Sequence, residues 1–484
     1  MIAKALQNAD ADAGGGWLEK LDSVDLVALT SWRYTNPVGD ICAKVGIAPA
    51  LATNSRRGGE TPVRLLHEAA LEVVRGEHRA CAIVGGEATN ARAQARKSGA
   101  KLPWSDMAPS DQSAQFAGLS TVRSPLAERY AMLDPASIYP LYETASHAAW
   151  DLSPAQAHDE SAKLWALYAQ AAGDNPSAWM ETPPSAETIG TIGPDNRLIN
   201  WPYPKLMVAN PSVNQASAFI VTTLAHARNA GIPEDKLVYI LGGAAANEPA
   251  NFLDRDRYDR STAQEAVLSA ALAQVGGVEE LTFMELYSCF PIVPKMALRF
   301  MGIEQDQAAP SVTGGLTFFG GPLHNYMSHA ICAMVRALRA HPHSSGLLYG
   351  QGGYVTKHHA LLLGSDAPQD TLAADWSVQA EADRNRGPSP QVREDYAGPA
   401  TLEAFTVRHS RDGEPDQGIV VVRTPAGERT LARVPGHYRE TIDLLEAWDR
   451  SPVGTDGMIT LCDDGDAVWQ PLATTPLSIR RLEA

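Results

Sequence analysis

The stretches DLVALTSW at residues 25–32 and LTFMELYSCF at residues 281–290 decide the fold, because they begin two copies of one pattern. In each copy an apolar strand leads through a proline-containing loop to a helix, which ends in AKVGI in the first copy and RFMGI in the second. From Asp25 to Ile47, and from Leu281 to Ile303, the separation is 22 positions. A repeated α/β unit predicts two similar halves related by a pseudo-two-fold axis.

The segments after each copy also correspond. Residues 56–87 and 318–353 each contain a glycine-rich loop, a long helix and an apolar strand that ends in glycines. In the first of these helices Thr61 is a candidate N-cap, with Pro62 at the first helical position. The second half also has an apolar strand, LVYILGGAAA at 237–246, before its first helix.

No such strand precedes the first helix of the first half, which is predicted at residues 2–11. A sheet that lacks an inner strand leaves backbone groups unpaired. We therefore interpret the native chain as beginning with a further strand. The alternative is that the first half tolerates the loss.

The repeat and the composition shifts along the chain divide it into five parts. Residues 1–88 and 206–235 form the first half, and 236–365 form the second half. Residues 89–205 are a long excursion, or loop domain, and such excursions in compact folds are usually functional. Residues 366–398 are a linker. Residues 399–484 contain short strands separated by turn signals, which is typical of a five-stranded barrel of the OB type.

Composition narrows the class of protein. The net charge is −16 and no run of lysines and arginines occurs, so nucleic acid is not an expected partner. No apolar run reaches the roughly 18 residues that a membrane span needs. The five cysteines are scattered and include no CxxC pair, which favours a reducing, cytoplasmic location. We expect neither a metal nor a permanently bound cofactor.

The doubled core with a long excursion in its first half resembles the thiolase superfamily. The quoted words that carry this likeness are ANPSVNQASAFIV (209–221), ELYSCF (285–290) and GGLTFFGGPL (314–323). Together with the β-rich tail, PDNRLINWPYPKLM (194–207) and GYVTKH (353–358) look most like the acetyl-CoA acetyltransferase or sterol-carrier-type thiolase-like branch. The resemblance covers about residues 1–365.

The resemblance implies an α/β thiolase fold, with two βαβαβ halves in five layers (αβαβα), plus a small C-terminal β-barrel. It also implies an acyl-CoA thioester as substrate. Thiolase cores usually pair through the first-half sheet, so a homodimer is expected, whose interface the tail domain either blocks or extends.

Thiolase chemistry uses a cysteine nucleophile, a histidine that activates it, a second cysteine and an oxyanion hole. This chain departs at each place. In SRRGGETP the nucleophile position falls near Gly59, and no cysteine lies between Cys42 and Cys81. The histidine of the glycine-rich loop falls at Gly321, and the Asn or His of the NEAF or HDCF word falls at Tyr287. The late motif reads LLYGQGG, without cysteine. An ordinary Cys–His thiolase mechanism is therefore excluded.

Four residues near these loops are candidates for catalysis. Tyr287 could transfer a proton, or be a core tyrosine with a satisfied hydroxyl. Cys289 would face the same side as Tyr287 if the strand continues, and is either a nucleophile or an inert buried thiol. His324 could replace the lost histidine, or cap a helix. His358 could line the pocket, or lie in a solvated turn.

Further residues are candidates for substrate binding. Asn325 could be an oxyanion donor and Lys357 could meet a phosphate, although capping and a solvated turn explain them equally. Glycines before helices can bind an oxyanion or phosphate through free N–H groups, or merely form tight turns. These are Gly58, Gly59, Gly320 and Gly321. Arg56 and Arg57 could attract a CoA phosphate, or be a surface pair.

Three functions fit these residues. The first is a thiolase-like acyltransferase that uses an unconventional residue. The second is a retro-aldol lyase that acts on a β-hydroxyacyl-CoA, which requires a base and an oxyanion hole but no acyl-cysteine. The third is a non-catalytic acyl-CoA-binding protein. Formation of a covalent acyl-enzyme separates the first from the others, and cleavage of a β-hydroxyacyl-CoA identifies the second.

Overall fold

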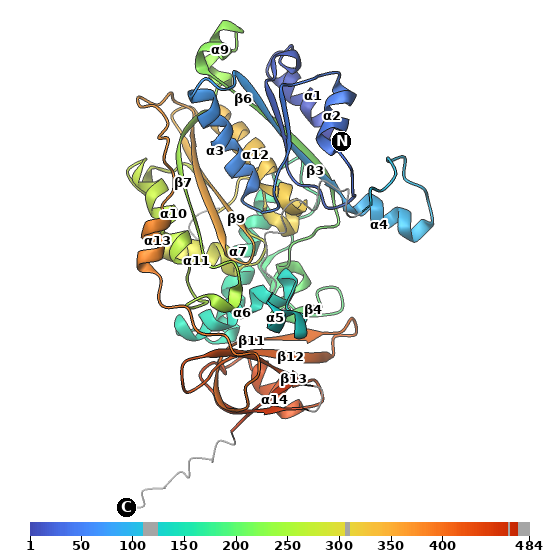
Figure 1. The fold of residues 1–484 in the computed structure, drawn as a ribbon, viewed down its shortest axis with the longest axis vertical. Helices are drawn as coiled ribbons and strands as arrows, with labels where there is room; N and C mark the ends of the chain where they lie inside the picture. Colours follow the sequence, from blue (N-terminus) through green and yellow to red (C-terminus); the bar gives the residue numbers. More distant parts are fainter. Residues whose placement is uncertain (110–123, 305–309, 463–464, 473–484) are drawn as a thin grey trace, which may run out of the picture.

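The computed structural model describes residues 1–109, 124–304, 310–462 and 465–472. Figure 1 shows a core of sheets and helices at one end of the molecule, a β-barrel at the other, and a group of helices between them. The core is built from the two repeated halves.

The first-half sheet has the strand order β2-β1-β3-β6. Strand β1 (Ser23–Leu26) is parallel to β2 (Leu51–Asn54) and to β3 (Ala80–Ala88), and β6 (Asn214–Thr222) is antiparallel to β3. Residues 80–87 of β3 are all buried, as expected for a continuous apolar run inside a covered sheet.

The second-half sheet has the order β7-β10-β9-β8. Strand β8 (Phe283–Leu286) is parallel to β9 (Ser345–Gly352), and β10 (Lys357–Gly364) is antiparallel both to β9 and to β7 (Tyr239–Asn247). The sequence β8, β9, β10 thus repeats the order and directions of β1, β3, β6. The predicted internal repeat is confirmed.

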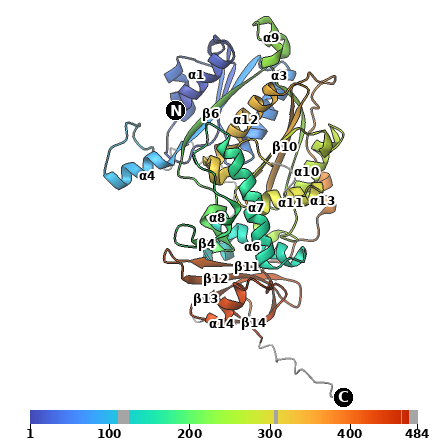
Figure 2. The same ribbon diagram turned by 180° about the vertical axis from the view of Figure 1, so that it is seen from behind.

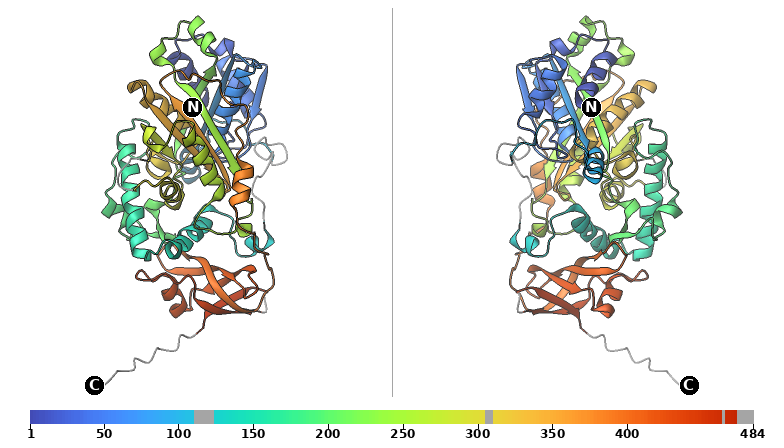
Figure 3. Two further views of the ribbon diagram at one scale, coloured as in Figure 1. Left: turned by 90° about the vertical axis from the view of Figure 1, so that its left-hand side faces the viewer. Right: turned by 90° about the vertical axis from the view of Figure 1, so that its right-hand side faces the viewer.

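Helices complete five layers, which confirms the predicted thiolase fold. Helices α1 (Ile2–Asp12) and α2 (Pro37–Val45) cover the outer face of the first sheet. Helices α3 (Thr61–Val74) and α12 (Tyr326–Ala340) lie between the sheets, and α10 (Thr262–Ala273) and α11 (Ile292–Met301) cover the second sheet. In Figure 1 these layers lie side by side, with α10 on one side and α1 and α2 on the other, and the two views in Figure 3 look along the stack from either end. A short helix, α9 (Leu224–Asn229), follows β6.

The two sheets differ at one edge. Strand β10 lies between β7 and β9, whereas its counterpart β6 is an edge strand. The residues that the structure describes contain no first-half counterpart of β7. The further strand expected before residue 2 stays a prediction.

The loop domain is mostly helical and lies between the core and the barrel (Figure 2). Helix α7 begins with a capping box, in which the side chains of Ser153 and Gln156 each bind the other residue's backbone N–H. Two short strands, β4 (Leu198–Trp201) and β5 (Tyr203–Pro204), end the domain. The helices are α4 (Thr89–Ser98), α5 (Pro125–Arg129), α6 (Pro135–Ala149), α7 (Pro154–Gly173) and α8 (Ala186–Gly190).

A buried ion pair joins the loop domain to the core. Lys295 of α11 donates to Glu143 Oε1 of α6 at 2.6 Å, and also to the carbonyl oxygen of Ala157 and to Ser161 Oγ of α7. The Tyr203 hydroxyl donates to the second oxygen of Glu143, also at 2.6 Å. Both charges are thus fully hydrogen-bonded although both side chains are at most 2% exposed.

The C-terminal strands close into the predicted five-stranded barrel, in the order β12-β13-β15-β14-β11 with a closing pair between β11 and β12. Outside the barrel, β4 of the loop domain pairs with β11, with Trp201 opposite Val407. A short helix, α14 (Arg439–Leu445), was not predicted. The barrel strands are β11 (Gly398–His409), β12 (Pro415–Arg423), β13 (Arg429–Pro435), β14 (Asp456–Leu461) and β15 (Ala467–Pro471).

Three local predictions were wrong. The N-cap of α3 is Glu60, so Thr61 is the first helical residue. The strand at 281–290 ends at Leu286, because its pairing with β9 stops at Tyr349, so Cys289 lies in a loop. Lys357 and His358 belong to strand β10, not to a solvated turn. The predicted linker also contains a helix, α13 (Gln379–Asn385).

Candidate functional site

The Tyr287 hydroxyl occupies the space that a side chain of residue 59 would need. Gly59 lies two residues before α3, and a Cβ atom added there would stand 2.5 Å from Tyr287 Oη and even closer to the carbonyl oxygen of Gln351. Only glycine allows this approach. A phenol from the other half therefore fills the space beside Gly59, the position that the resemblance aligns with the thiolase nucleophile.

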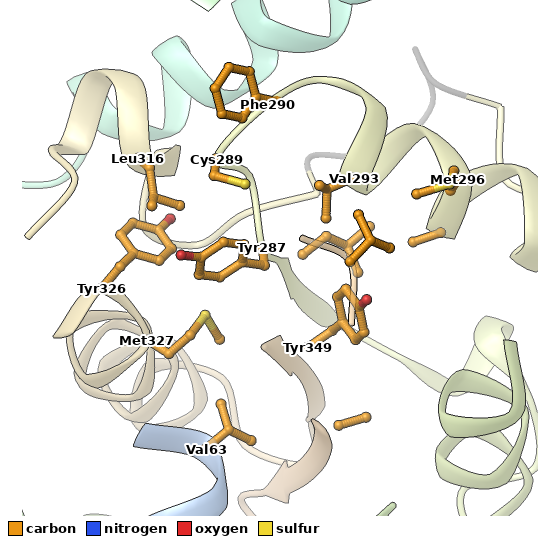
Figure 4. Close-up of a cluster of buried hydrophobic side chains, with 14 of the residues drawn as sticks. Val63, Tyr287, Cys289, Phe290, Val293, Met296, Leu316, Tyr326, Met327 and Tyr349 are labelled. Carbon is orange, nitrogen blue, oxygen red and sulfur yellow. The ribbon is translucent and has the colours of Figure 1, made fainter. Parts of the chain in front are cut away.

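Tyr287 is held in a dry environment. Its backbone N–H donates to the carbonyl oxygen of Tyr349 at 3.1 Å, and its ring packs edge to face against Tyr326, with 6.0 Å between centroids. Figure 4 shows the phenol inside a cluster of buried side chains, with its hydroxyl end near Tyr326. Burial, with smaller effects of Cys289 and Glu60, raises the pKa of Tyr287 well above 10. The phenol is therefore neutral and acts as a hydrogen-bond donor.

Cys289 lies in the same cluster, on the loop between β8 and α11 (Figure 4). It is 8% exposed, and burial raises the pKa of its thiol to about 12 in spite of hydrogen bonds with Tyr139 and Gln351. Because the thiolate is the nucleophilic form, this thiol is poorly suited to attack a thioester at neutral pH.

Glu60, which the sequence analysis did not single out, stands beside Gly59 at the start of α3. It is 7% exposed, and its carboxyl group lies against Gly58 and over the Cα atom of Gly352. Its Oε2 atom has no hydrogen-bond partner among the residues that the structure describes. Burial raises the pKa of Glu60, and the nearby Lys357 ammonium partly offsets this effect.

Basic side chains lie beside these buried groups. The Lys357 ammonium donates to the carbonyl oxygen of Arg57 at 3.4 Å. Burial, together with the charges of Arg57 and Lys357, lowers the pKa of His324 to about 4. All three side chains are partly exposed. His324 is neutral at physiological pH, whereas Arg57 and Lys357 supply positive charge next to it.

The remaining binding candidates lie against the first-half sheet. Gly320 packs against Val213 and Gln215, and the Gly321 N–H donates to the carbonyl oxygen of Asn210 at 2.8 Å. Asn325 donates to Ser217 Oγ at 3.0 Å. These contacts fix the loop that precedes α12.

His358 faces away from Glu60 and Tyr287. It is 2% exposed, and its Nδ1 lies 2.7 Å from the Tyr349 hydroxyl while its Nε2 lies 3.2 Å from the carbonyl oxygen of Val355. Burial lowers its pKa to about 4. A neutral imidazole that donates through Nε2 and accepts through Nδ1 satisfies both contacts. His358 is thus part of an internal hydrogen-bond network next to α10.

The structure therefore brings Gly58, Gly59, Tyr287 and Lys357 to one place. Cys289 lies near Tyr287, and His324 lies near Arg57 and Lys357. The fold also adds Glu60 and Gln351 to this place. Glu60 directly follows the lost nucleophile position, and that adjacency was the only sequence signal for it.

Comparison with solved structures identifies the fold. The SCP2-thiolase-like protein type 1 from Mycobacterium smegmatis, described as monomeric, superposes with a TM-score of 0.79 at 28% identity, over 96% of this chain and 91% of that one. The chain has the thiolase fold. A human mitochondrial 3-ketoacyl-CoA thiolase in complex with CoA matches with a TM-score of 0.52 at 14% identity, over 75% of this chain and 91% of that one.

Two further comparisons concern the branch of this thiolase-fold protein. Residues 378–464 match the family model of the thiolase-like protein type 1 additional C-terminal domain, which confirms the predicted tail. The Ltp2–ChsH2(DUF35) aldolase matches with a TM-score of 0.55 at 17% identity, over 75% of this chain and 91% of that one. No curated protein matches the sequence.

The sequence also led to expectations about a membrane span, a homodimer and the location of the protein. In the part of the chain that the structure describes, no helix is both long and apolar enough to cross a membrane. The homodimer stays a prediction, and so does the cytoplasmic location.

Proposed function

We propose that this protein is a lyase that cleaves β-hydroxyacyl-CoA thioesters by retro-aldol chemistry, without an acyl-enzyme. The observation that carries the proposal is the Tyr287 hydroxyl above Gly59. A neutral donor stands where a thiolase needs a nucleophile, and residue 59 has no side chain that could be acylated.

The proposed step balances without a cofactor. A base takes the proton of the β-hydroxyl group, the bond between Cα and Cβ breaks, and the electron pair passes to the thioester as an enolate. The Tyr287 hydroxyl donates a hydrogen bond to the developing enolate oxygen. The proton then returns to Cα. The products are an aldehyde or ketone and a shortened acyl-CoA.

The basic side chains favour a CoA ester as the substrate. Arg57 and Lys357 place positive charge beside the buried groups, and the phosphates of CoA require positive charge on the protein. Among proteins of this fold, one human thiolase is known in complex with CoA, and the Ltp2–ChsH2(DUF35) protein is an aldolase. These likenesses agree with the proposal.

Acyl transfer through Cys289, the first function considered above, is less well supported by the site. With a pKa of about 12, only about one thiol in 10⁵ is ionised at pH 7. Acyl transfer also requires the thioester to reach a thiol that is only 8% exposed.

Non-catalytic binding of an acyl-CoA is the second candidate, because the site is closed. Glu60, Tyr287 and Cys289 are each at most 8% exposed. A protein that holds the thioester at the basic side chains alone would not need to open this cluster.

The test combines product analysis with intact-mass spectrometry after incubation with a panel of β-hydroxyacyl-CoA and acyl-CoA esters. The lyase predicts a shortened acyl-CoA, no protein adduct, and a loss of about 10²–10³-fold in kcat for Tyr287→Phe. Tyr130→Phe, which removes another buried hydroxyl, one that accepts a hydrogen bond from the backbone N–H of Ala467 in the barrel, controls for loss of packing and should retain activity.

Each other outcome selects an alternative. An acyl adduct that is mapped to Cys289 and lost in Cys289→Ala would establish the acyltransferase and refute the lyase. Binding of CoA esters with neither adduct nor cleavage would establish the binding protein.

A further inference from the structure

Glu60 differs from the other well-buried glutamates of the described chain. Glu87, Glu143, Glu248 and Glu285 each accept a hydrogen bond on both carboxyl oxygens. Glu60 Oε2 alone in this group has no donor. Among these five glutamates, four have both carboxyl oxygens satisfied and Glu60, which lies beside Gly59, does not.

An unsatisfied buried carboxylate oxygen is costly, and more so when the group is charged. The charge of Lys357, the backbone N–H of Glu60 itself and the charge of Arg64 stabilise the ionised carboxyl group only in part, because burial still raises its pKa. Lys357 is close enough to lower its pKa, but its ammonium donates to the carbonyl oxygen of Arg57. The free oxygen is therefore suited to accept a donor that comes with a ligand.

The surroundings define where that donor would lie. The carboxyl group projects over Gly352, where any side chain would collide with Oε2, and it lies next to Gly58 and Gly59. The negative charge of Glu60 is also close enough to contribute to the raised pKa of Tyr287. One acceptor and one donor, the carboxyl of Glu60 and the phenol of Tyr287, thus stand beside the same glycine.

We propose that Glu60 accepts the proton of a hydroxyl group on the β-carbon of the substrate, so that the site selects β-hydroxyacyl thioesters over their saturated counterparts. The inference rests on the proposed function, because it assigns the base that the retro-aldol step requires. The proton moves from the hydroxyl group to Glu60 as the Cα–Cβ bond breaks, and it returns to Cα from the same carboxyl group.

The electrostatic surroundings suit a base. A carboxyl group whose pKa is raised toward neutrality accepts a proton more readily than an exposed one. Burial raises the pKa of Glu60, while Lys357 and Arg64 keep the ionised form accessible. The charged or titratable groups that face it are Lys357, Arg64 and Tyr287.

The test measures binding separately from cleavage. The Kd values of β-hydroxybutyryl-CoA and butyryl-CoA are determined by calorimetry for the wild type and for Glu60→Gln. We expect the wild type to prefer the hydroxyl ester by at least about tenfold, since a hydrogen bond to a charged acceptor is stronger than one between neutral groups. Glu60→Gln should reduce this ratio to about twofold and leave the Kd of butyryl-CoA unchanged.

Two further variants guard the result. Glu68→Gln makes the same charge change on the same helix, where Glu68 pairs with Arg64 at the surface, and should keep the wild-type ratio. Glu60→Asp retains the carboxyl group and should restore part of the preference, which covers the case in which the amide variant folds poorly.

The outcomes separate this inference from the lyase. If the hydroxyl preference vanishes in Glu60→Gln while no variant cleaves the ester, the inference stands and the lyase fails. If the wild type cleaves the ester and Glu60→Gln cleaves it equally well, the lyase stands and the inference is overturned. Equal affinity of the wild type for the two esters, or no affinity for either, also overturns it.

Discussion

Two buried carboxylates, Glu143 in the loop domain and Glu60 at the start of α3, have opposite surroundings. Glu143 is bound by Lys295 and Tyr203, and Lys295 and His147 lower its pKa to about 2 in spite of its burial. Glu60 has an oxygen without a donor, and burial moves its pKa upward. The first arrangement connects three helices and needs nothing further. The second is incomplete without another molecule, so the comparison separates a group that stabilises the fold from one that serves a ligand.

The largest effect is expected at the satisfied pair. Lys295→Met leaves Glu143 buried without its cation and should lower the free energy of unfolding by about 3–5 kcal/mol, as measured by urea denaturation. The double variant Lys295→Met/Glu143→Leu removes both charges and should recover most of this loss. A loss below about 1 kcal/mol in the single variant would contradict the view that this pair is structural.

The next largest effect concerns a pair of buried histidines that are uncharged. His67 of α3 and His359 of β10 join the two halves through a ring contact of 3.0 Å between nitrogens, and Trp376 of the linker packs on both. Burial lowers the pKa of His67 from 6.5 to about 4. The unfolded chain therefore binds a proton more readily than the folded one between these values.

The contribution of His67 to stability should consequently fall by about 3 kcal/mol as the pH drops from about 6.5 to 4, and His324 and His358, whose pKa values are also lowered to about 4, add to the total fall. Denaturation curves recorded across this range for the wild type and for His67→Gln test the expectation, because the variant should show the shallower dependence. Glu143 acts in a separate window, since its lowered pKa gives stability that is present above about pH 4.5 and lost toward pH 2. A profile that is flat between pH 6.5 and 4 would show that the histidine pair does not titrate as described.

The smallest effect on the free energy of unfolding is expected at Glu60, and it can be compared directly with the effect of the same change at Glu143. Glu60→Gln removes a buried charge that has no donor, so the free energy of unfolding at pH 7 should stay within about 0.5 kcal/mol of the wild type or rise. Glu143→Gln, the matched change at the satisfied site, should cost at least about 2 kcal/mol. Equal losses in the two variants would mean that Glu60 is also a structural residue.

The fold was predictable because it rests on repetition. The matching segments at 25–47 and 281–303 indicated two equivalent sheets, and the five apolar runs of the tail indicated the barrel. Strand β10 was missed because KHHALLLG begins with three basic or polar residues, which resemble a turn. The burial of His358 depends on a contact with Tyr349 of the neighbouring strand β9 and on the charge of Glu248, which lies far away in sequence.

The candidate site was predictable only in part. The loss of the nucleophile at Gly59 and the presence of Tyr287 followed from the motifs, but their contact required the two halves to be packed together. Glu60 was not predicted as a site residue, because the neighbouring Thr61 and Pro62 are typical of an ordinary helix start. Whether a buried carboxylate has donors is decided by tertiary contacts, and one sequence does not contain that information in readable form.

The pairing of β4 with β11 has a consequence for how the tail should be regarded. Thr144 of α6 also exchanges two hydrogen bonds with the backbone of Phe405, so the barrel shares both a strand edge and a helix with the excursion from the first half. The family model of the tail begins near residue 378, but these contacts mean that the tail should not unfold independently of the loop domain. A chain truncated there would expose the unpaired edge of β4 and the surface of α6 that the barrel covers. Such a chain should aggregate and not fold as a smaller protein.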